Sequence, residues 1–460
     1  MLVIPGRPAQ SGLTWWVLGE DGRQPSIEIE GPGGTVANIS MCPLDAVHVP
    51  GAILVGTTGL RPDSDYTLRA SDTGGTRAEA RARTLPAAGG PGQKLTIALG
   101  SCFSLAQDKG MLAAAYPPAQ HGPGRDPIHL RILLGDQIYM DLDPSSGSPI
   151  IFRTPDPWAR YLRQWQTPHF SQFISASPNL SMADDHEFWN DYPHGNVWLR
   201  WADPDNAGVA DFDPAFSIFQ SALNVEPTMV GALAANDAAR AAALEQQART
   251  FELPTSPVSI FVLDTRTRRT RYDAQRPRLC EPGWLAAAVA WLSNLTSPGV
   301  LVVSQPLVET AAGWFTRAVH TMGDVNLPEY REDFATLWRA ILDAPHDVLI
   351  VSGDIHWNRL YNVHTGARQD HNVFELITSP LARIKQGGDV KDVGNKTGKV
   401  EWTGGSASWN RLFAENGKTS YATVTFTAAT PVAVQVSLWG PRTSMSEAST
   451  PVAQASFKLA

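Results

Sequence analysis

Side chains that can bind metals or carry protons follow a short apolar run near the middle of this chain. In His129–Asp141 (HLRILLGDQIYMD), the apolar run Leu130–Leu134 ends at Gly135 and Asp136, and Tyr139 follows three residues later. A run of this kind is typical of a strand buried on both faces in a parallel sheet. Because Gly135 permits a sharp turn, we expect Asp136 just beyond the carboxyl end of the strand, with Tyr139 close to it.

The same arrangement recurs at five further apolar runs, each of which ends in polar or metal-binding residues. The runs are Leu95–Leu99, Leu180–Ala183, Val258–Leu263, Val300–Val303 and Val348–Val351. The residues that follow them, in the same order, are Gly100-Ser101-Cys102, Asp184-Asp185-His186-Glu187, Asp264-Thr265-Arg266, Ser304-Gln305 and Ser352-Gly353-Asp354-Ile355-His356-Trp357. Because ligands bind outside the carboxyl ends of strands in α/β sheets, we expect these side chains to share one site.

The donors at these strand ends predict a site with more than one metal ion. They are Cys102, Asp136, Tyr139, Asp185, His186, Asp354 and His356. Asp136 can bridge two cations through its two oxygens, and a thiolate together with a phenolate suits Fe(III) or zinc. Two cations roughly 3.5–4 Å apart would clamp a phosphoryl group and activate a hydroxide.

Each of these residues also has a structural alternative. Asp136 could cap a following helix, and Cys102 could be a buried small hydrophobic residue, as free cysteines usually are. Tyr139 could be a core aromatic residue, and His186 and His356 could be hydrogen-bonded structural histidines. The presence of donors at several strand ends favours the ligand interpretation for all of them.

Composition excludes several classes of protein. The chain has 460 residues, 43% of them hydrophobic and 18% charged, which is ordinary for a folded protein and long enough for two domains. A net charge of -8 argues against broad nucleic-acid binding. Three cysteines make no disulfide framework, and no apolar run reaches the roughly 18 residues of a membrane span. The segment MLVIPGRPAQ resembles no signal peptide, so we expect a cytoplasmic protein by default, or a secreted one if the chain is a processed form.

The chain divides into two regions by pattern. Residues 1–90 alternate short β-rich runs with Gly, Pro and Asp turns, which predicts a small antiparallel sandwich, and residues 85–92 (LPAAGGPG) read as a linker. From residue 94 onward strands alternate with helices, interrupted by insertions at 141–179 and 191–256. The predicted helices are Asp108–Tyr116, Trp158–Phe173, Ala207–Arg249 with Pro and Gly breaks, Trp284–Leu292 and Phe334–Leu342. Three β-rich runs at the end of the chain are expected to extend or back the sheet: Tyr421–Thr427, Val432–Trp439 and Ala455–Leu459.

Five of these motifs, in this order, resemble one known family. Gly135-Asp136-Gln137-Ile138-Tyr139 is similar to the GDxxY element of purple acid phosphatases and of PhoD-like alkaline phosphatases. The segments around Cys102, Asp184–Phe188, Leu263–Arg266 and Ser352–Trp357 resemble the remaining PhoD-like motifs, so the match covers about residues 94–380. The resemblance implies an α/β fold, a calcineurin-like metallophosphoesterase αββα sandwich, in residues 94–460. It also implies a fibronectin type III-like β-sandwich domain in residues 1–90.

The resemblance further implies a role for each donor. Cys102, Tyr139 and His356 would hold an Fe(III) ion, and Asp136 would bridge it to a second metal position. Asp185, in the place of the asparagine of the common GNH motif, would hold Ca²⁺ there with Asp354, because carboxylate oxygens suit calcium. Zinc or another divalent metal is the alternative. His186 would be the general acid or a phosphate-stabilising group.

Two further strand-end residues are left with open alternatives. Arg266 could bind phosphate oxygens through two parallel hydrogen bonds, or it could form a buried structural ion pair with a carboxylate. Gln305 stands where many metallophosphoesterases have a VxxH element, which this chain lacks, and is a weaker candidate for a substrate or second-site contact.

Together these observations predict a metal-dependent phosphoesterase. Its partners would be a phosphate-ester small molecule or a phosphodiester polymer, with no stable nucleic-acid binding and no membrane span. Two other functions compete with this one: an inactive member of the same family that serves as a binding module, and a zinc hydrolase of another ester. No GxSxG nucleophile elbow, HExxH or CxxC motif is present in the sequence.

Overall fold

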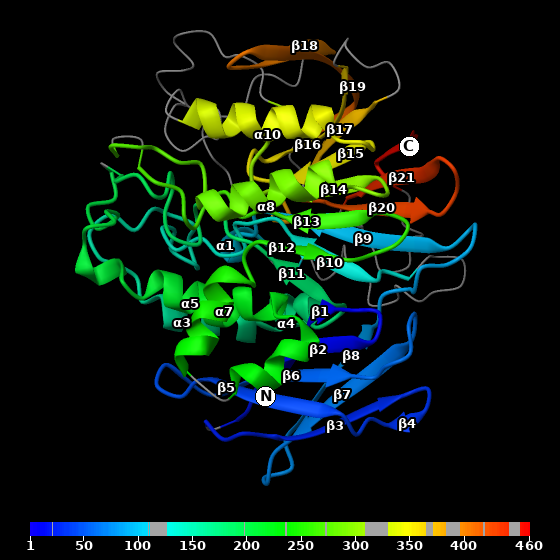
Figure 1. Ribbon diagram of the computed structural model, residues 1–460. Helices are drawn as coiled ribbons and strands as arrows, with labels where there is room; N and C mark the ends of the chain where they lie inside the picture. Colours follow the sequence, from blue (N-terminus) through cyan, green and yellow to red (C-terminus); the bar gives the residue numbers. More distant parts are fainter. Residues whose placement is uncertain are drawn as a thin grey trace.

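Two central sheets contain all six of the strands predicted to carry the site. The computed structural model describes all residues except 21, 109, 111–126, 197, 235–236, 272–273, 309–329, 365–370, 383–395, 417–418 and 441–450. In this part of the chain the sheets lie between layers of helices, with the N-terminal strands at one end (Figure 1). None of the described helices is long and apolar enough to cross a membrane.

The first central sheet has six strands and contains three of the predicted runs. Its order is β11 (Asn179–Ser181), β10 (Leu130–Leu133), β9 (Lys94–Gly100), β20 (Tyr421–Thr427), β21 (Val432–Trp439) and β22 (Ala453–Leu459). The strands β9, β10 and β11 are parallel, so Cys102, Asp136 and Asp185 all follow strand ends at one edge. The C-terminal strands extend this sheet, as predicted, because β20 pairs with β9 in the antiparallel sense.

The second central sheet has eight strands and contains the other three runs. Its order is β12 (Phe251–Leu253), β13 (Ser259–Val262), β14 (Gly299–Val302), β15 (Val348–Ser352), β17 (Val373–Ile377), β16 (Trp357–His364), β19 (Gly405–Asn416) and β18 (Thr397–Trp402). Strands β13, β14, β15 and β17 are parallel.

Alternation along the strands explains how the layers pack. Ile97 and Leu99 of β9 lie in the same hydrophobic cluster as Val300 and Val302 of β14, so this cluster fills the space between the two sheets. The intervening Ala98 belongs to a different cluster, which contains the inserted helices. The outer face of the eight-stranded sheet packs against α8 (Pro282–Ser293) and α10 (Arg331–Asp343). This order of helix, sheet, sheet and helix is the expected αββα sandwich.

The helices of the two insertions cover the six-stranded sheet. They are α3 (Pro157–Gln166), α4 (Pro168–Ile174), α5 (Phe212–Phe219), α6 (Val230–Leu233) and α7 (Asp237–Gln246), with 3₁₀ turns η1 (Ala207–Val209), η2 (Ser221–Asn224) and η3 (Pro227–Met229). The single helix predicted over Trp158–Phe173 is wrong, because it breaks at Thr167, which is extended with ψ 124°. The cause is Pro168, which disfavours helical geometry in the residue before it. Of the helix predicted over Asp108–Tyr116, only Asp108 lies in a described helix, α1 (Leu105–Asp108); 109 and 111–116 lie outside the described residues.

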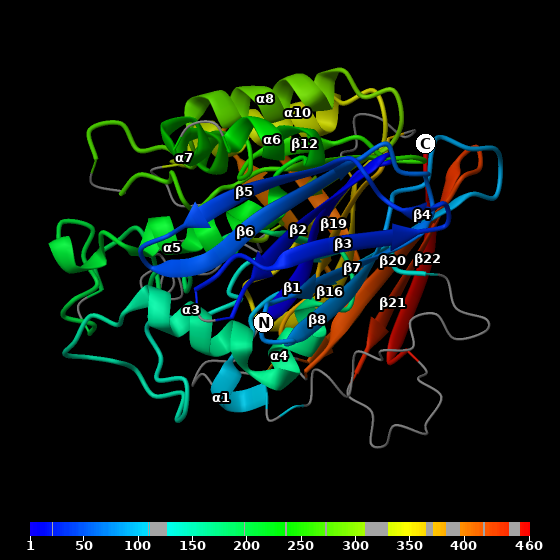
Figure 2. The same ribbon diagram turned by 90° about the horizontal axis from the view of Figure 1, so that it is seen from below.

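The N-terminal residues form the predicted antiparallel sandwich. One sheet is β1 (Leu2–Pro8), β2 (Gly12–Leu18), β6 (Val49–Thr58) and β5 (Ile39–Asp45), and the other is β4 (Gly34–Thr35), β3 (Ser26–Gly31), β7 (Asp65–Ser71) and β8 (Arg77–Arg83). The Tyr66 hydroxyl accepts a hydrogen bond from the Arg61 amide at 2.8 Å, which fastens the turn into β7. In Figure 2, which views this end of the molecule, the blue N-terminal strands lie nearest the viewer.

The sandwich is joined to the inserted helices by a buried seam. Ile4, Trp16 and Leu54 lie in the same hydrophobic cluster as the aromatic residues of α3 and α5. Trp16 Nε1 also donates to the Ile218 carbonyl at 3.0 Å, and Thr14 Oγ1 donates to the Val225 carbonyl at 2.7 Å. The seam therefore combines apolar burial with satisfied hydrogen bonds.

Candidate metal centre

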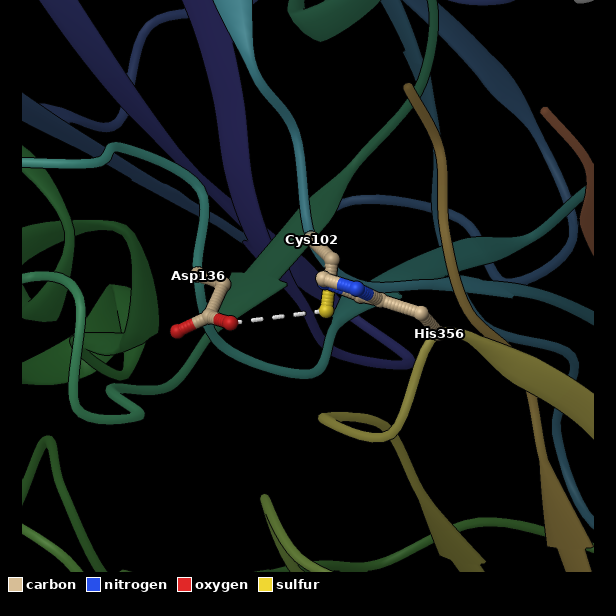
Figure 3. Close-up of side chains that lie close together, drawn as sticks. All are labelled: Cys102, Asp136 and His356. Atoms are coloured by element: carbon tan, nitrogen blue, oxygen red, sulfur yellow. Dashed lines mark hydrogen bonds between the residues drawn. The ribbon is translucent and has the colours of Figure 1, made fainter. Parts of the chain in front are cut away.

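The strand ends bring the predicted metal ligands together, and Asp136 lies at their centre. Among the described residues, three groups of side chains have ligand atoms within 4.8 Å of one another, and Asp136 belongs to all three. The groups are Cys102–Asp136–His356, Asp136–Asp185–His186 and Asp136–Asp184–Asp354. Figure 3 shows the Cys102 sulfur and the Asp136 carboxylate facing each other, with the His356 ring beside them.

The backbone at this edge is held in left-handed geometry. Four of the six described non-glycine residues with positive φ are predicted ligands: Cys102 (58°), Asp136 (56°), Asp354 (70°) and His356 (55°). This conformation is unfavourable for residues with a side chain and persists where surrounding structure enforces it, often at functional sites. Gly135 has φ 97°, and a Cβ there would lie 2.5 Å from Asp184 Cβ, so only glycine fits beneath the site.

The first group lies beside Tyr139 and, with it, contains the four residues that the resemblance assigns to iron. Asp136 Oδ2 lies 3.4 Å from Cys102 Sγ and 3.1 Å from the Tyr139 hydroxyl. The Tyr139 hydroxyl lies 3.3 Å from His356 Nε2. Burial, together with the Asp136 carboxylate, raises the pKa of the Cys102 thiol and of the Tyr139 phenol. A cation placed among these four side chains would favour their deprotonated forms, so this donor set fits a metal.

The carboxylates beyond Asp136 offer a second position. Asp184 Oδ2 and Asp185 Oδ1 are buried and have no hydrogen-bond partner in the described part of the chain. Buried polar atoms are almost always satisfied, so two such oxygens beside Asp136 fit a cation. Burial raises the pKa of Asp184 to about 7. From the sequence, Asp185 was favoured as a ligand over its neighbour Asp184; in the structure each of the two belongs to one of the three donor groups.

Glu187 fixes the loops that carry the carboxylates. Its Oε2 accepts hydrogen bonds from the amides of Asp136, at 2.9 Å, and Asp184, at 2.8 Å, and its Oε1 accepts one from the Gln137 amide at 2.7 Å. Burial raises the pKa of Glu187 to about 7. One fully buried side chain thus ties the β10 and β11 loops together. Its position in the Asp184–Phe188 motif was visible in the sequence, but this role was not predicted.

His186 is oriented by a carboxylate that the sequence did not single out. Its Nδ1 lies 2.8 Å from Asp141 Oδ1, while Asp141 Oδ2 accepts the Asn190 amide at 3.2 Å. Burial alone would lower the pKa of His186, but the carboxylates of Asp141, Asp185 and Asp136 raise it well above the usual value. A charged imidazolium is therefore favoured, and the contact with Asp141 leaves Nε2 as the nitrogen that can give a proton.

Arg266 forms the buried ion pair that was one of its two predicted alternatives. Its Nε and Nη2 lie 2.8 Å and 2.7 Å from Asp184 Oδ1, and its Nη1 donates to the Tyr192 carbonyl at 2.8 Å. The side chain is only 1% exposed. A phosphate contact for Arg266 stays a prediction. Gln305 is also buried and accepts a hydrogen bond from Arg269 through Oε1; it belongs to none of the three metal-ligand groups among the described residues.

Comparison with known proteins supports the fold and gives no family assignment. No protein-family model and no curated protein matches the chain. Among solved structures, PhoD is similar over 99% of this chain and 89% of its own, with 16% identity and a TM-score of 0.64. The purple acid phosphatase PPD1 from yellow lupin (Lupinus luteus) seeds is similar over 99% of this chain and 74% of its own, with 13% identity and a TM-score of 0.55. The predicted resemblance is thus confirmed at the level of the fold: this chain has the fold of PhoD and of a purple acid phosphatase.

Proposed function

We propose that this protein is a metal-dependent phosphoesterase that hydrolyses phosphomonoesters, phosphodiesters or both. The observation that carries the proposal is the position of Asp136. Its Oδ2 lies beside the thiol and the phenol, its Oδ1 accepts the His186 amide at 3.2 Å, and it belongs to all three donor groups. A carboxylate with both oxygens committed in this way is suited to bridge two cations. The fold, shared with two phosphatases, supports the same function.

We propose Fe(III) and Ca²⁺ as the metals. Cys102, Tyr139 and His356 would hold iron with Asp136, because thiolate and phenolate stabilise a highly charged ion. Asp185 and Asp354, together with Asp184, would hold calcium, which prefers carboxylate oxygens. When bound, such ions would lower the pKa of a water nucleophile and neutralise charge on the phosphoryl group.

The remaining steps fall to side chains of this chain. His186, charged because of the surrounding carboxylates, would protonate the leaving oxygen from Nε2, and Asp141 holds its ring in place. Arg266 favours the ionised form of Asp184, against the effect of burial, and holds this carboxylate in position. We further propose residues 1–90 as a separate sandwich domain and residues 94–460 as the catalytic domain.

Metal content and substrate preference test this function together. Protein purified without a His-tag would be assayed by mass spectrometry for metals and by visible spectroscopy for an absorption band from tyrosinate bound to Fe(III). It would also be assayed against nitrophenyl esters of phosphate, phosphodiester, sulfate and acetate. We expect iron with calcium and turnover of the phosphate esters. Zinc alone with turnover of sulfate or acetate would replace the proposal with another ester hydrolase.

A Cys102→Ser variant separates the enzyme from an inactive binding module. The serine hydroxyl is a poor substitute for a thiolate, so we expect loss of the iron and of its absorption band. Cys42→Ala, which alters a buried cysteine of the sandwich, is the matched control and should keep both. Unchanged metal content in Cys102→Ser, together with no turnover of any ester by the unmodified protein, would favour the binding-module alternative.

A further inference from the structure

The seam between the sandwich and the catalytic part contains a cavity of about 290 Å³. Arg7 of β1 forms part of its lining, with Val225, Ala243, Thr250 and Phe251. The lining also includes Met229, Ala248 and the exposed side chains of Gln246, Gln247, Glu226 and Glu252. No residue of the three metal-ligand groups takes part in this lining. A volume near the lower end of ordinary ligand pockets suits a small metabolite.

Arg7 is buried, and within the described residues it forms no ion pair. Arg7 is 7% exposed, and its guanidinium stacks 4.4 Å above the centre of the Phe251 ring. Nη2 donates to the Glu252 carbonyl at 2.9 Å, and Nη1 makes a longer contact of 3.4 Å with the Asn224 carbonyl. Nε is buried and has no hydrogen-bond partner in the part of the chain that the structure describes.

Two other buried guanidinium groups of this chain are balanced by carboxylates. Arg266 pairs with Asp184 at 2.7 Å, and Arg249 pairs with Asp213 at 2.8 Å. Within the described residues, by contrast, no Asp or Glu oxygen lies within 4.0 Å of the Arg7 guanidinium. Burying a cation away from water is costly unless it is paired. Burial lowers the pKa of Arg7 to about 10, against an opposing effect of Glu226, so the group remains charged at neutral pH.

We propose that this cavity is a second ligand site, distinct from the metal centre, for a small organic anion. A carboxylate or phosphate group would face the Arg7 guanidinium, while an uncharged body would lie along Val225 and Ala243. The carboxylates of Glu226 and Glu252 at the lining disfavour additional negative charge, so the ligand carries its charge at one end. Gln246 and Gln247 offer amide groups for polar atoms of the same ligand.

Calorimetry on the metal-loaded full chain tests the proposal with two probes. Butyrate presents a carboxylate and propylphosphonate presents a phosphate-like group, and butylamine serves as the cationic control. We expect binding of at least one anion and no binding of the amine. Arg7→Gln should weaken the affinity for the anion about tenfold or more, since the substitution removes a charge-assisted contact. If neither probe binds at millimolar concentration, the proposal is overturned.

A pair of surface variants keeps the test independent of folding. Gln247 is exposed, so Gln247→Glu and Gln247→Lys change the charge beside the cavity without disturbing the core. We expect weaker anion binding in the first variant and tighter binding in the second. Equal affinity in the two would overturn the assignment even if Arg7→Gln fails to fold. Asp136→Asn shows which of the two sites the probe occupies. If the probe binds at the seam, its affinity is unchanged in this variant. Loss of binding in this variant would place the probe at the metal centre and contradict the proposal.

Discussion

The metal centre and the seam cavity are two buried regions with unbalanced charge of opposite sign. At the strand ends, several carboxylates, a thiol and a phenol surround Asp136, and four of the predicted ligands have left-handed backbone geometry. At the seam, a single guanidinium sits on β1 with negative φ and is held by two main-chain carbonyls. The metal centre holds many donor side chains in place at once, as catalysis by bound metal ions would require. The seam cavity holds one charged side chain in place, which is enough to bind an anion.

The largest effect is expected at the shared carboxylate. Asp136→Asn removes a donor from every group of the metal centre, so metal content and activity should fall together. The loss in kcat/KM should exceed the roughly 10- to 100-fold typical of residues that only support a metal ligand. Activity and metal analysis of the purified variant check this, with the partly exposed Asp143→Asn as control. Full turnover with both metals retained would contradict the bridging role.

The two buried arginines should differ in what they contribute to folding. Arg266→Gln leaves the buried Asp184 carboxylate unpaired, and breaking a buried pair typically costs about 3–5 kcal/mol of the free energy of unfolding. Arg7→Gln leaves no carboxylate behind, so its cost should be smaller. Chemical denaturation of both variants measures the difference.

A double variant identifies the cause. Adding Asp184→Asn to Arg266→Gln should recover part of the lost stability, because the orphaned charge is removed. An Arg266→Gln variant with wild-type stability and a raised KM would instead indicate a phosphate contact, the other alternative for this residue.

The His186–Asp141 contact gives a smaller and pH-dependent effect. Asp141 raises the pKa of His186, so Asp141→Asn should lower that pKa and reduce kcat by roughly 10- to 100-fold. His186 acts as an acid only when protonated, and activity is therefore lost as pH rises through its pKa. In Asp141→Asn this descending limb should lie at lower pH than in the unmodified protein. A limb that stays in place, measured as kcat against pH, would argue against His186 as the proton donor.

The smallest expected effect is a difference between the two regions in how ligand affinity depends on pH. The pKa values of Cys102, Asp136 and Tyr139 are raised in the metal-free chain, so metal binding must displace protons, and metal affinity should increase with pH. Arg7, with a pKa of about 10, stays protonated between about pH 6 and 8, so anion binding at the seam should change little there. Calorimetry in buffers of different ionisation enthalpy counts the protons released. Equal proton release by metal and anion would remove the contrast.

Local pattern was sufficient to predict the strands and the principal donors. All six apolar runs contain strands, and Tyr421–Thr427 and Val432–Trp439 have the predicted bounds. These features could be predicted because the hydrophobic pattern of a strand involves only residues that are neighbours in the sequence. In residues 1–90 the pattern is weaker: β1 contains Pro5, Gly6 and Pro8, and its register with β2 shifts between the two prolines.

Features that depend on contacts between residues far apart in the chain could not be predicted from the sequence. Glu187 acts by binding amides of residues about 50 positions earlier, and Asp141 acts through the His186 ring. The seam cavity requires Arg7 to meet Glu252, 245 residues away. Such pairings depend on how the sheets and helices pack together, and no periodic pattern in the local sequence indicates them.

The buried seam has a consequence for how the molecule melts. Trp16 and Ile4 are completely buried against the inserted helices, so residues 1–90 and the rest of the chain stabilise each other. A chain cut at the 85–92 linker would leave an apolar surface bare on each piece. We therefore expect the two parts to unfold in a single cooperative transition, and either part alone to aggregate.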